Sequence, residues 1–348
     1  DNIMNFKKTT LVIASAALFL GIVGQASASI YARSYLDVSN LTIGLDNPNN
    51  TINNFNFQST NTASLNGSGT LASGASCSGI PGIPGAGTNN CNPDAGAGST
   101  GLNTPGTRSD AQHIAINTAY NENGYSLQGP GALEFSQSDS TIWTSQLTFD
   151  ASTHIEGLAE SELQTGTNAA ASAEIQSTTS FTFNFTIGGP DPATLFINFD
   201  ATWDTLAAIA DPDPTLLASA QANKRIQFTL SNDSTGDRII WDPNSDVASS
   251  CFAIGAGLGC TENAIGGNLQ EDFGVTTDPN SSGNAGSGAF SVDFTGLTNG
   301  DWTFTANAFV STSLSRQVTA IPEPSILLLL GASFAGMGIA RRLRKKSA

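Results

Sequence analysis

Oxygen-bearing side chains around position 242 could bind a metal ion. Asp242, Asn244 and Asp246 offer ligand oxygens at alternate positions, and Ca²⁺ prefers carboxylate and amide oxygens. An EF-hand loop that starts there needs Gly at position 247 and Glu at position 253, but the chain has Val247 and Ala253. Two interpretations stay open, a Ca²⁺ site of another kind and a solvated turn. We expect no other cofactor.

Three glutamates and two histidines are the candidates for catalysis. Glu156, Glu160 and Glu162 could supply the paired carboxylates of a glycoside hydrolase, which must line a cleft. A nucleophilic triad would have to use His113 or His154, because the chain has only 2 histidines. Neither histidine lies in a nucleophile motif. We therefore predict no catalytic residue and expect that the protein is not an enzyme.

The four cysteines form two pairs that are close in sequence. Cys77 pairs most simply with Cys91, and Cys251 with Cys260. In the chain-entropy model, closing a loop of about 15 residues stabilises a protein by about 3 kcal/mol. A four-thiolate zinc site is the alternative, but these spacings differ from the close pairs of such sites. We expect two local disulfides and no metal at the cysteines.

Alternating apolar and polar residues predict the strands that must position these side chains. The pattern is clearest in the second half of the chain, over residues 181–187, 195–203, 226–230, 238–241, 290–294 and 302–310. Such alternation is typical of half-buried antiparallel strands. We expect residues 238–241 to pair behind the turn Asn232–Gly236, and Asn299-Gly300 to join the last two segments as a hairpin. The predicted fold is an all-β antiparallel sandwich, jelly-roll-like.

The first half of the chain gives a weaker pattern. The apolar alternation changes parity around Ser39-Asn40, which indicates a bulge or a turn. Residues 169–175 have some helix propensity, but their small-residue alternation favours a strand. Residues 58–110 are mostly Gly, Ser, Thr, Asn and Pro, so we predict a long low-complexity insertion there.

The charge balance excludes one class of partner. Residues 29–319 contain six basic and 27 acidic residues, a net charge of −21. A field of this sign repels nucleic acid and favours solubility. We therefore expect no nucleic-acid partner.

Both ends of the chain carry targeting patterns. Met4 to Ala28 has a charged start, an apolar run and the small-residue site Ala26-Ser27-Ala28, so we predict a signal peptide that signal peptidase cuts after Ala28. Residues 325–340 contain no charge, and as a helix they would span roughly 24 Å. Basic residues follow this run, as at the cytoplasmic end of a transmembrane helix. They are Arg341, Arg342, Arg344, Lys345 and Lys346.

The order of these C-terminal elements is similar to the PEP-CTERM sorting signal. Pro322-Glu323-Pro324 precedes the apolar run, and the basic cluster follows it. The resemblance implies an exported protein that is anchored in the inner membrane transiently and processed by an exosortase. It also implies an association with exopolysaccharide and biofilm, at the cell surface or in the extracellular matrix. The expected organisation is a signal peptide (4–28), a β-sandwich domain (29–319) and a sorting signal (320–348).

Three functions remain open. The leading hypothesis is an exported structural protein of the cell surface or the polymer matrix. The second is a carbohydrate-binding, lectin-like module with extracellular polysaccharide as partner, which would need exposed tryptophans on one strand face. The candidates are Trp143, Trp203, Trp241 and Trp302, three of which lie on apolar faces. The third is a secreted hydrolase that would bring His113 or His154 within hydrogen-bond distance of a Ser or an Asp.

Overall fold

The computed structural model describes most of the chain between residues 29 and 318. The described ranges are 29–47, 49–65, 70–79, 106–115, 127, 129–131, 134–144, 149–164, 171–189, 192–210, 216–246, 250–276 and 280–318. Within them every regular element is a β-strand, and no helix there is long and apolar enough to cross a membrane. The transmembrane helix predicted within residues 320–348 lies outside the described residues.

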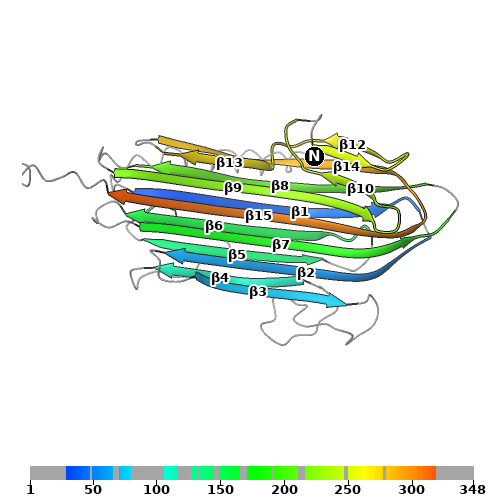
Figure 1. Ribbon diagram of the computed structural model, residues 1–348, viewed down its shortest axis with the longest axis horizontal. Coiled ribbons are helices and arrows are strands. Elements are labelled where there is room, and N and C mark those ends of the chain that lie inside the picture. The colour runs from blue at the N-terminus through cyan, green and yellow to red at the C-terminus, as the bar shows by residue number, and fades with distance from the viewer. Residues whose placement is uncertain are drawn as a thin grey trace, which may run out of the picture.

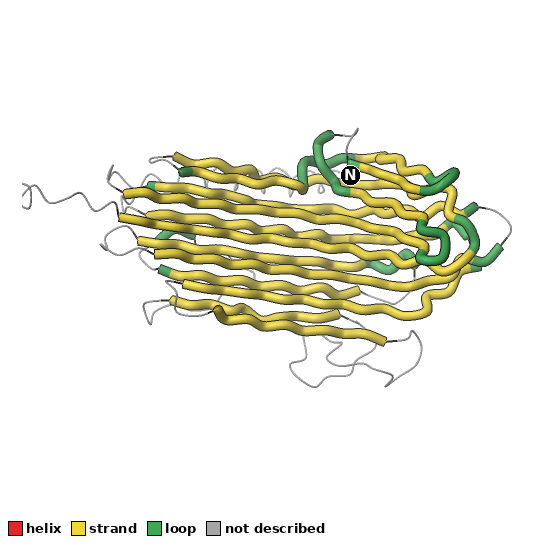
Figure 2. The backbone as a smooth tube through the Cα atoms, in the orientation of Figure 1, coloured by secondary structure: helices red, strands yellow, loops and turns green. Residues whose placement is uncertain are grey.

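The strands form two antiparallel sheets that run along the long axis of the molecule (Figures 1 and 2). Sheet A contains, in spatial order, β12 (Gly259–Ala264), β14 (Asn280–Leu297), β8 (Ala193–Ile209), β1 (Ser29–Leu45), β6 (Thr153–Gln164), β5 (Phe135–Thr144) and β4 (Gly106–Ala115). Sheet B contains β11 (Cys251–Ile254), β10 (Asp237–Trp241), β9 (Leu216–Asn232), β15 (Gly300–Val318), β7 (Ala171–Ile187), β2 (Asn50–Leu65) and β3 (Thr70–Gly79). A further strand of sheet B, β13 (Gln270–Val275), pairs with β9 beside β10. The predicted all-β antiparallel sandwich is confirmed.

Strand alternation explains why the two sheets pack face to face. On β15, Trp302, Phe304 and Val310 point inward and are at most 2% exposed. Thr303 and Thr305 lie between them and point outward, as period two requires. The other long strands follow the same pattern, so the inward faces of both sheets form one apolar layer.

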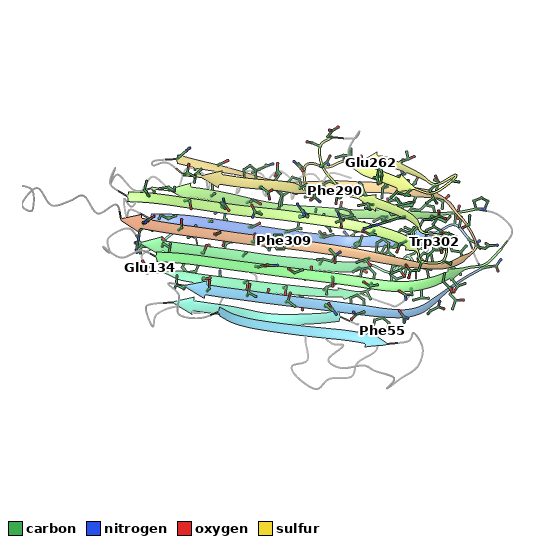
Figure 3. The ribbon with its side chains drawn as sticks, in the orientation of Figure 1. Phe55, Glu134, Glu262, Phe290, Trp302 and Phe309 are labelled. Atoms are coloured by element: carbon green, nitrogen blue, oxygen red, sulfur yellow. A yellow bond between two sulfur atoms is a disulfide. The ribbon has the colours of Figure 1, made fainter. Side chains whose placement is uncertain are left out.

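The core differs between the two ends of the strands. Large aromatic side chains fill one end, where Trp302 and Phe55 lie, and Glu134 lies at the other end (Figure 3). Phe199 stacks on Phe290 with ring centroids 4.9 Å apart. Offset aromatic contacts of this kind add to the stabilisation that buried area provides.

Small polar residues fill much of the remaining interior. Ser177 Oγ on β7 donates to the Asp139 carbonyl on β5 at 2.8 Å. Ser161 and Thr312 share a hydrogen bond of 2.8 Å between their hydroxyl groups. Each of these bonds joins sheet A to sheet B, so a side chain as short as Ser spans the gap. The sheets therefore approach each other closely where the core contains no aromatic rings.

The predicted irregularity at Ser39-Asn40 is a β-bulge in β1. The register of β1 against β6 shifts between Val38 and Leu41. Asn40 adopts a positive φ of 54°, which Asn tolerates better than most residues. The bulge keeps Val38 and Leu41 both buried although they are three positions apart.

One of the two predicted hairpins is confirmed and the other is wrong. The turn Asn232–Gly236 joins β9 to β10, which pair directly. Asn299-Gly300 instead connects β14 in sheet A to β15 in sheet B. The Asn-Gly turn reverses the chain, but β7 and β9 occupy both edges of β15. The inward side chains of β14 and β15 therefore meet across the core.

Strands occupy part of the stretch in which we predicted a low-complexity insertion, residues 58–110. β2 continues through Leu65, β3 covers Thr70–Gly79 and β4 starts at Gly106. The rest of the stretch lies outside the described residues. The strand predicted over residues 169–175 is confirmed from Ala171 onward, as the start of β7.

Candidate functional site

The outer face of sheet B carries a regular array of uncharged polar side chains. Five rows cross β2, β7, β15 and β9 in that order, and every member is half-buried or exposed. The rows are Asn54, Asn184, Thr303 and Ser231; Asn56, Thr182, Thr305 and Thr229; Gln58, Ser180, Asn307 and Gln227; Thr60, Thr178, Phe309 and Arg225; Thr62, Gln176, Ser311 and Asn223. We call this array the amide–hydroxyl face. Arg225 is its one charged member and Phe309 its one apolar member.

The β-sheet sets the spacing of this face. Neighbouring strands lie about 4.8 Å apart, and side chains on one face recur about every 7 Å along a strand. Some members bond to each other: Thr182 and Thr305 share a hydrogen bond of 3.2 Å, and the Asn223 amide bonds to the Ser311 hydroxyl at 3.1 Å. Hydroxyl and amide groups both donate and accept hydrogen bonds. The face can therefore bind a ligand that presents both kinds of group.

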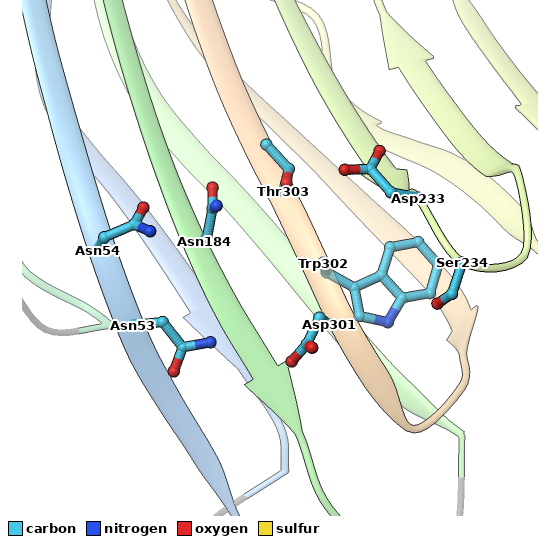
Figure 4. A pocket seen from close by; sticks show the side chains of 8 residues that line it. All are labelled: Asn53, Asn54, Asn184, Asp233, Ser234, Asp301, Trp302 and Thr303. Carbon is cyan, nitrogen blue, oxygen red and sulfur yellow. The ribbon is translucent and has the colours of Figure 1, made fainter.

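A hollow of about 340 Å³ lies at one end of the amide–hydroxyl face (Figure 4). Its lining residues are Asn53, Asn54, Asn184, Asp233, Ser234, Asp301, Trp302 and Thr303. Beside it, Asn53 Nδ2 donates to Thr186 Oγ1 at 2.9 Å, and Thr186 Oγ1 donates to Asp301 Oδ1 at 2.5 Å. The hollow therefore lies where the polar rows reach the ends of these strands.

The outer face of sheet A has the opposite character, because titratable groups gather on it. Arg33 binds Asp204 through two contacts of 2.9 and 3.0 Å. Tyr35 Oη donates to Glu156 Oε1 at 2.8 Å. The outer face of sheet A therefore gathers charged groups, whereas the rows of the amide–hydroxyl face are mostly uncharged and have Asp233 and Asp301 at one end.

The three glutamates considered for glycoside hydrolysis all lie on this face of β6. Tyr31 Oη donates to Glu160 Oε1, and Gln137 Nε2 donates to Glu160 Oε2 at 2.6 Å. The backbone N–H of Gly131 donates to both oxygens of Glu162, at 2.8 and 3.1 Å. Glu160 and Glu162 are both 0% exposed. Protein groups therefore hold these carboxyl oxygens in place.

Burial controls the protonation of this cluster. It raises the pKa of Glu162 to about 8, and the charge of Glu160 adds to the shift, while the bond from Gly131 opposes it. Burial and the charge of Glu160 also raise the pKa of Tyr31. The low polarity of the site disfavours the charged form of both groups.

His154 lies within hydrogen-bond distance of an aspartate. Its Nε2 is 2.8 Å from Asp37 Oδ1, and both side chains are partly exposed. Burial lowers the pKa of His154, but the hydrogen bond and the charge of Asp37 outweigh this effect, so the net pKa is raised. His113 lies on β4 opposite Gln137. Of the two candidate histidines, His154 is therefore paired with an aspartate.

The candidate Ca²⁺ ligands form a turn with hydrogen bonds of its own. Asn244 Oδ1 accepts from the Asp246 N–H at 2.7 Å, and Asp242 Oδ1 accepts from Gln227 Nε2 at 2.9 Å. Among the described residues, no group of three His, Cys, Asp or Glu side chains is placed to hold a metal ion. These hydrogen bonds hold the turn in place, and both interpretations of it stay open.

The local pairing of Cys251 with Cys260 is present as a disulfide. It joins β11 of sheet B to β12 of sheet A at their shared edge. Cys77 lies on β3. Cys91 lies outside the described residues, so the pair Cys77–Cys91 stays a prediction.

Three of the four tryptophans contribute to the core and not to an exposed binding platform. Trp203, Trp241 and Trp302 are at most 4% exposed and belong to the core. Trp143 lies on β5. Sequence reasoning considered aromatic residues and did not identify the amide–hydroxyl face. The sequence did contain a signal for this face. Thr, Asn and Ser residues alternate with the core residues along the predicted strands.

Comparison with protein families gives one match, at the C-terminus. The family model of the PEP-CTERM protein-sorting motif matches residues 320–345. The chain carries a PEP-CTERM sorting motif. This motif implies an exported protein that is anchored at the membrane before an exosortase processes it. No curated protein and no solved structure matches the chain.

The PEP-CTERM match spans most of the predicted sorting residues. It contains Pro322, Glu323, Pro324 and the basic residues Arg341, Arg342, Arg344 and Lys345, while Lys346 follows it directly. These residues, like the predicted signal-peptide site at Ala26 and Ala28, lie outside the described residues. The match concerns the export and processing of the protein and assigns no activity to the sandwich.

Proposed function

We propose that this protein is a non-enzymatic structural component of the extracellular polymer matrix that contacts neutral polysaccharide through the amide–hydroxyl face. After processing it would stay at the cell surface or in the matrix. The observation that carries the proposal is the pattern of the face: rows of Ser, Thr, Asn and Gln that cross four long strands with one charged member.

The hydrogen-bonding groups of the face support this choice of partner. A neutral polysaccharide offers hydroxyl groups that donate and accept, and hydroxyl and amide side chains match both roles. Each such hydrogen bond is weak in water, about 1 kcal/mol or less. Many equivalent groups along a polymer raise the overall affinity, because each bound unit increases the effective concentration of the next. A broad face with repeated spacing suits an extended polymer.

Binding to insoluble polysaccharide tests the proposal. We expect the purified mature protein to sediment with a neutral polymer such as cellulose or cross-linked dextran. Thr305 lies in the second row of the face and Asn307 in the third. The double substitution Thr305→Lys and Asn307→Lys places two long charged side chains there and should reduce the bound fraction at least several-fold.

Thr202→Lys supplies the matched control. Thr202 lies on the outer face of sheet A, opposite Asp37, and is half-buried like Thr305. This variant should bind the polymer as the wild type does. Equal binding by the wild type and the double variant, or no binding to any neutral polymer by the wild type, would refute the role of the face.

A secreted hydrolase is a second candidate, because His154 lies 2.8 Å from Asp37. A hydrolase of this kind would lose its activity on replacement of Asp37 by Asn, since the aspartate orients the imidazole. Activity assays with ester and glycoside substrates should distinguish the hydrolase from the structural protein. Turnover by the wild type that Asp37→Asn abolishes would favour the hydrolase over the structural role.

A further inference from the structure

Lys224 lies inside the sandwich although it is a lysine. It lies on β9 among inward-facing positions and is 1% exposed. Its Nζ contacts Glu271 Oε2 on β13, the residue directly opposite it in the β9–β13 register. The rings of Trp203 and Phe273 flank the amine, with centroids 5.7 and 5.5 Å from Nζ. The amine is therefore held in aromatic surroundings beside one carboxyl group.

The same carboxyl group contacts a side-chain amide from the other sheet. Asn284 Nδ2 on β14 lies 3.1 Å from Glu271 Oε1 and 3.2 Å from Glu271 Oε2. Glu271 thus touches the Lys224 amine and the Asn284 amide at once, and Oε2 contacts both nitrogens. β13 lies along the edge of the molecule beside β9, and β14 belongs to sheet A (Figure 1). Three strands from two sheets position the three groups.

The surroundings favour the neutral amine more than water does. Burial lowers the pKa of Lys224, and the hydrogen bond and charge of Glu271 offset only part of this effect. Removing an ion pair from water costs several kcal/mol for each ion, whereas proton transfer from Nζ to the carboxylate leaves two neutral groups. A neutral, desolvated lysine amine is a nucleophile.

We propose that Lys224 and Asn284 form an intramolecular isopeptide bond, with Glu271 as the proton carrier. Glu271 takes one proton from the ammonium group, and the neutral Nζ attacks the side-chain carbonyl carbon of Asn284. The new C–Nζ bond forms, Glu271 delivers its proton to Nδ2, and the C–Nδ2 bond breaks. Ammonia leaves, and the carboxylate takes the second proton of Nζ. One amine and one amide become a secondary amide and ammonia, with no change in oxidation state.

The bond would connect the two sheets covalently. β9 belongs to sheet B and β14 to sheet A, so the link would keep the sheets from separating at this edge. A cross-link also restricts the unfolded chain, which raises the free energy of unfolding. This inference is independent of the polysaccharide proposal, because Lys224 lies in the interior and not on the amide–hydroxyl face.

Mass spectrometry of the full-length exported protein tests the bond directly. After denaturation, the intact mass should be lower than the sequence mass by one ammonia, once processing and disulfides are counted. Proteolysis should release one branched peptide that joins Lys224 to Asn284. Separate linear peptides containing unmodified Lys224 and Asn284, without the branched one, would overturn the proposal whatever any variant does.

Variants identify the role of each group. Lys224→Met and Glu271→Gln should both remove the loss of ammonia, and circular dichroism should confirm that each variant keeps its β-sheet signal. Asn284→Asp should lose water in place of ammonia, because the leaving group changes from Nδ2 to a carboxyl oxygen. Ammonia loss that persists in Asn284→Asp would overturn the assignment of Asn284, and a cross-link that persists in Glu271→Gln would overturn the role of Glu271.

Glu262→Gln is the matched control. Glu262 is another partly buried carboxyl group of this edge region, where it accepts hydrogen bonds from Trp241 Nε1 and Ser250 Oγ. It lies on β12 and has no part in the proposed reaction. The variant should keep the branched peptide, and loss of the peptide in this variant would overturn the specific role assigned to Glu271.

Discussion

Glu162 shows how strongly the pKa of a side chain depends on its surroundings. The side chain sits on the outer face of a sheet, yet it is 0% exposed and accepts two contacts from the Gly131 N–H. Its pKa rises from 4.5 to about 8, chiefly because of burial. The folded protein therefore binds this proton more tightly than the unfolded chain does.

The raised pKa predicts a stability that falls as the pH rises. The contribution of Glu162 to the free energy of unfolding is fully present below about pH 4.5 and is lost as the pH rises to about 8. Glu162→Gln cannot ionise, but its side-chain oxygen can still accept from Gly131. We expect the variant to gain stability relative to the wild type over this window, on the order of a few kcal/mol at pH 8.

Urea unfolding at a series of pH values measures this difference. The wild-type and Glu162→Gln curves of stability against pH should converge near pH 4.5 and separate toward pH 8. Parallel curves over this window would mean that Glu162 ionises in the folded protein as it does in the unfolded chain.

At the scale of elements, the disulfide Cys251–Cys260 connects the short strands β11 and β12. These strands belong to different sheets, and the bond spans a sequence separation of 9. Like the proposed link from Lys224 to Asn284, it joins the sheets near one edge. Export to an oxidising compartment lets such a bond persist.

Replacing both cysteines by serine should destabilise the protein by roughly 2–3 kcal/mol, because the unfolded chain regains the entropy of an open loop. Thermal or urea unfolding with and without reductant measures the effect. Reductant should lower the stability of the wild type by breaking this disulfide. The variant lacks the disulfide, so reductant should not lower its stability in this way. An unfolding midpoint that the double substitution leaves unchanged would contradict the prediction.

At the scale of the whole molecule, the two outer faces differ in charge. Sheet A carries the half-buried carboxyl groups of Asp37, Glu156 and Asp204 on its outer face, and sheet B presents the amide–hydroxyl face. The uncharged rows of the amide–hydroxyl face reduce repulsion from other acidic molecules over that part of the sandwich.

The PEP-CTERM motif predicts a change in location when it is removed. A chain that ends before residue 320 keeps the predicted signal peptide and every described strand. We expect it to be exported without a membrane-anchored form, whereas the intact chain passes through one. Cell fractionation with intact-mass measurement detects both forms, and the same membrane association with and without residues 320–345 would contradict the sorting role.

Much of the fold could be predicted from the sequence, because strand alternation and turn chemistry are local. Alternating apolar and polar residues predicted parts of β7, β14 and β15, and the parity change at Ser39-Asn40 predicted a bulge or a turn where β1 has its bulge. The targeting patterns at both ends were equally local, and the C-terminal one matches a known family motif. These features require no knowledge of which strands become neighbours.

Only the tertiary structure decided which strands meet. Asn299-Gly300 reverses the chain in either arrangement, but the pairing of β15 with β7 and β9 places β14 in the other sheet. Lys224 and Glu271 are 47 positions apart, and Asn284 follows Glu271 by 13. Their meeting depends on strand pairing over long sequence separations, for which a single sequence carries no local signal. The sequence shows the chemistry of each residue, but the fold decides which residue becomes its partner.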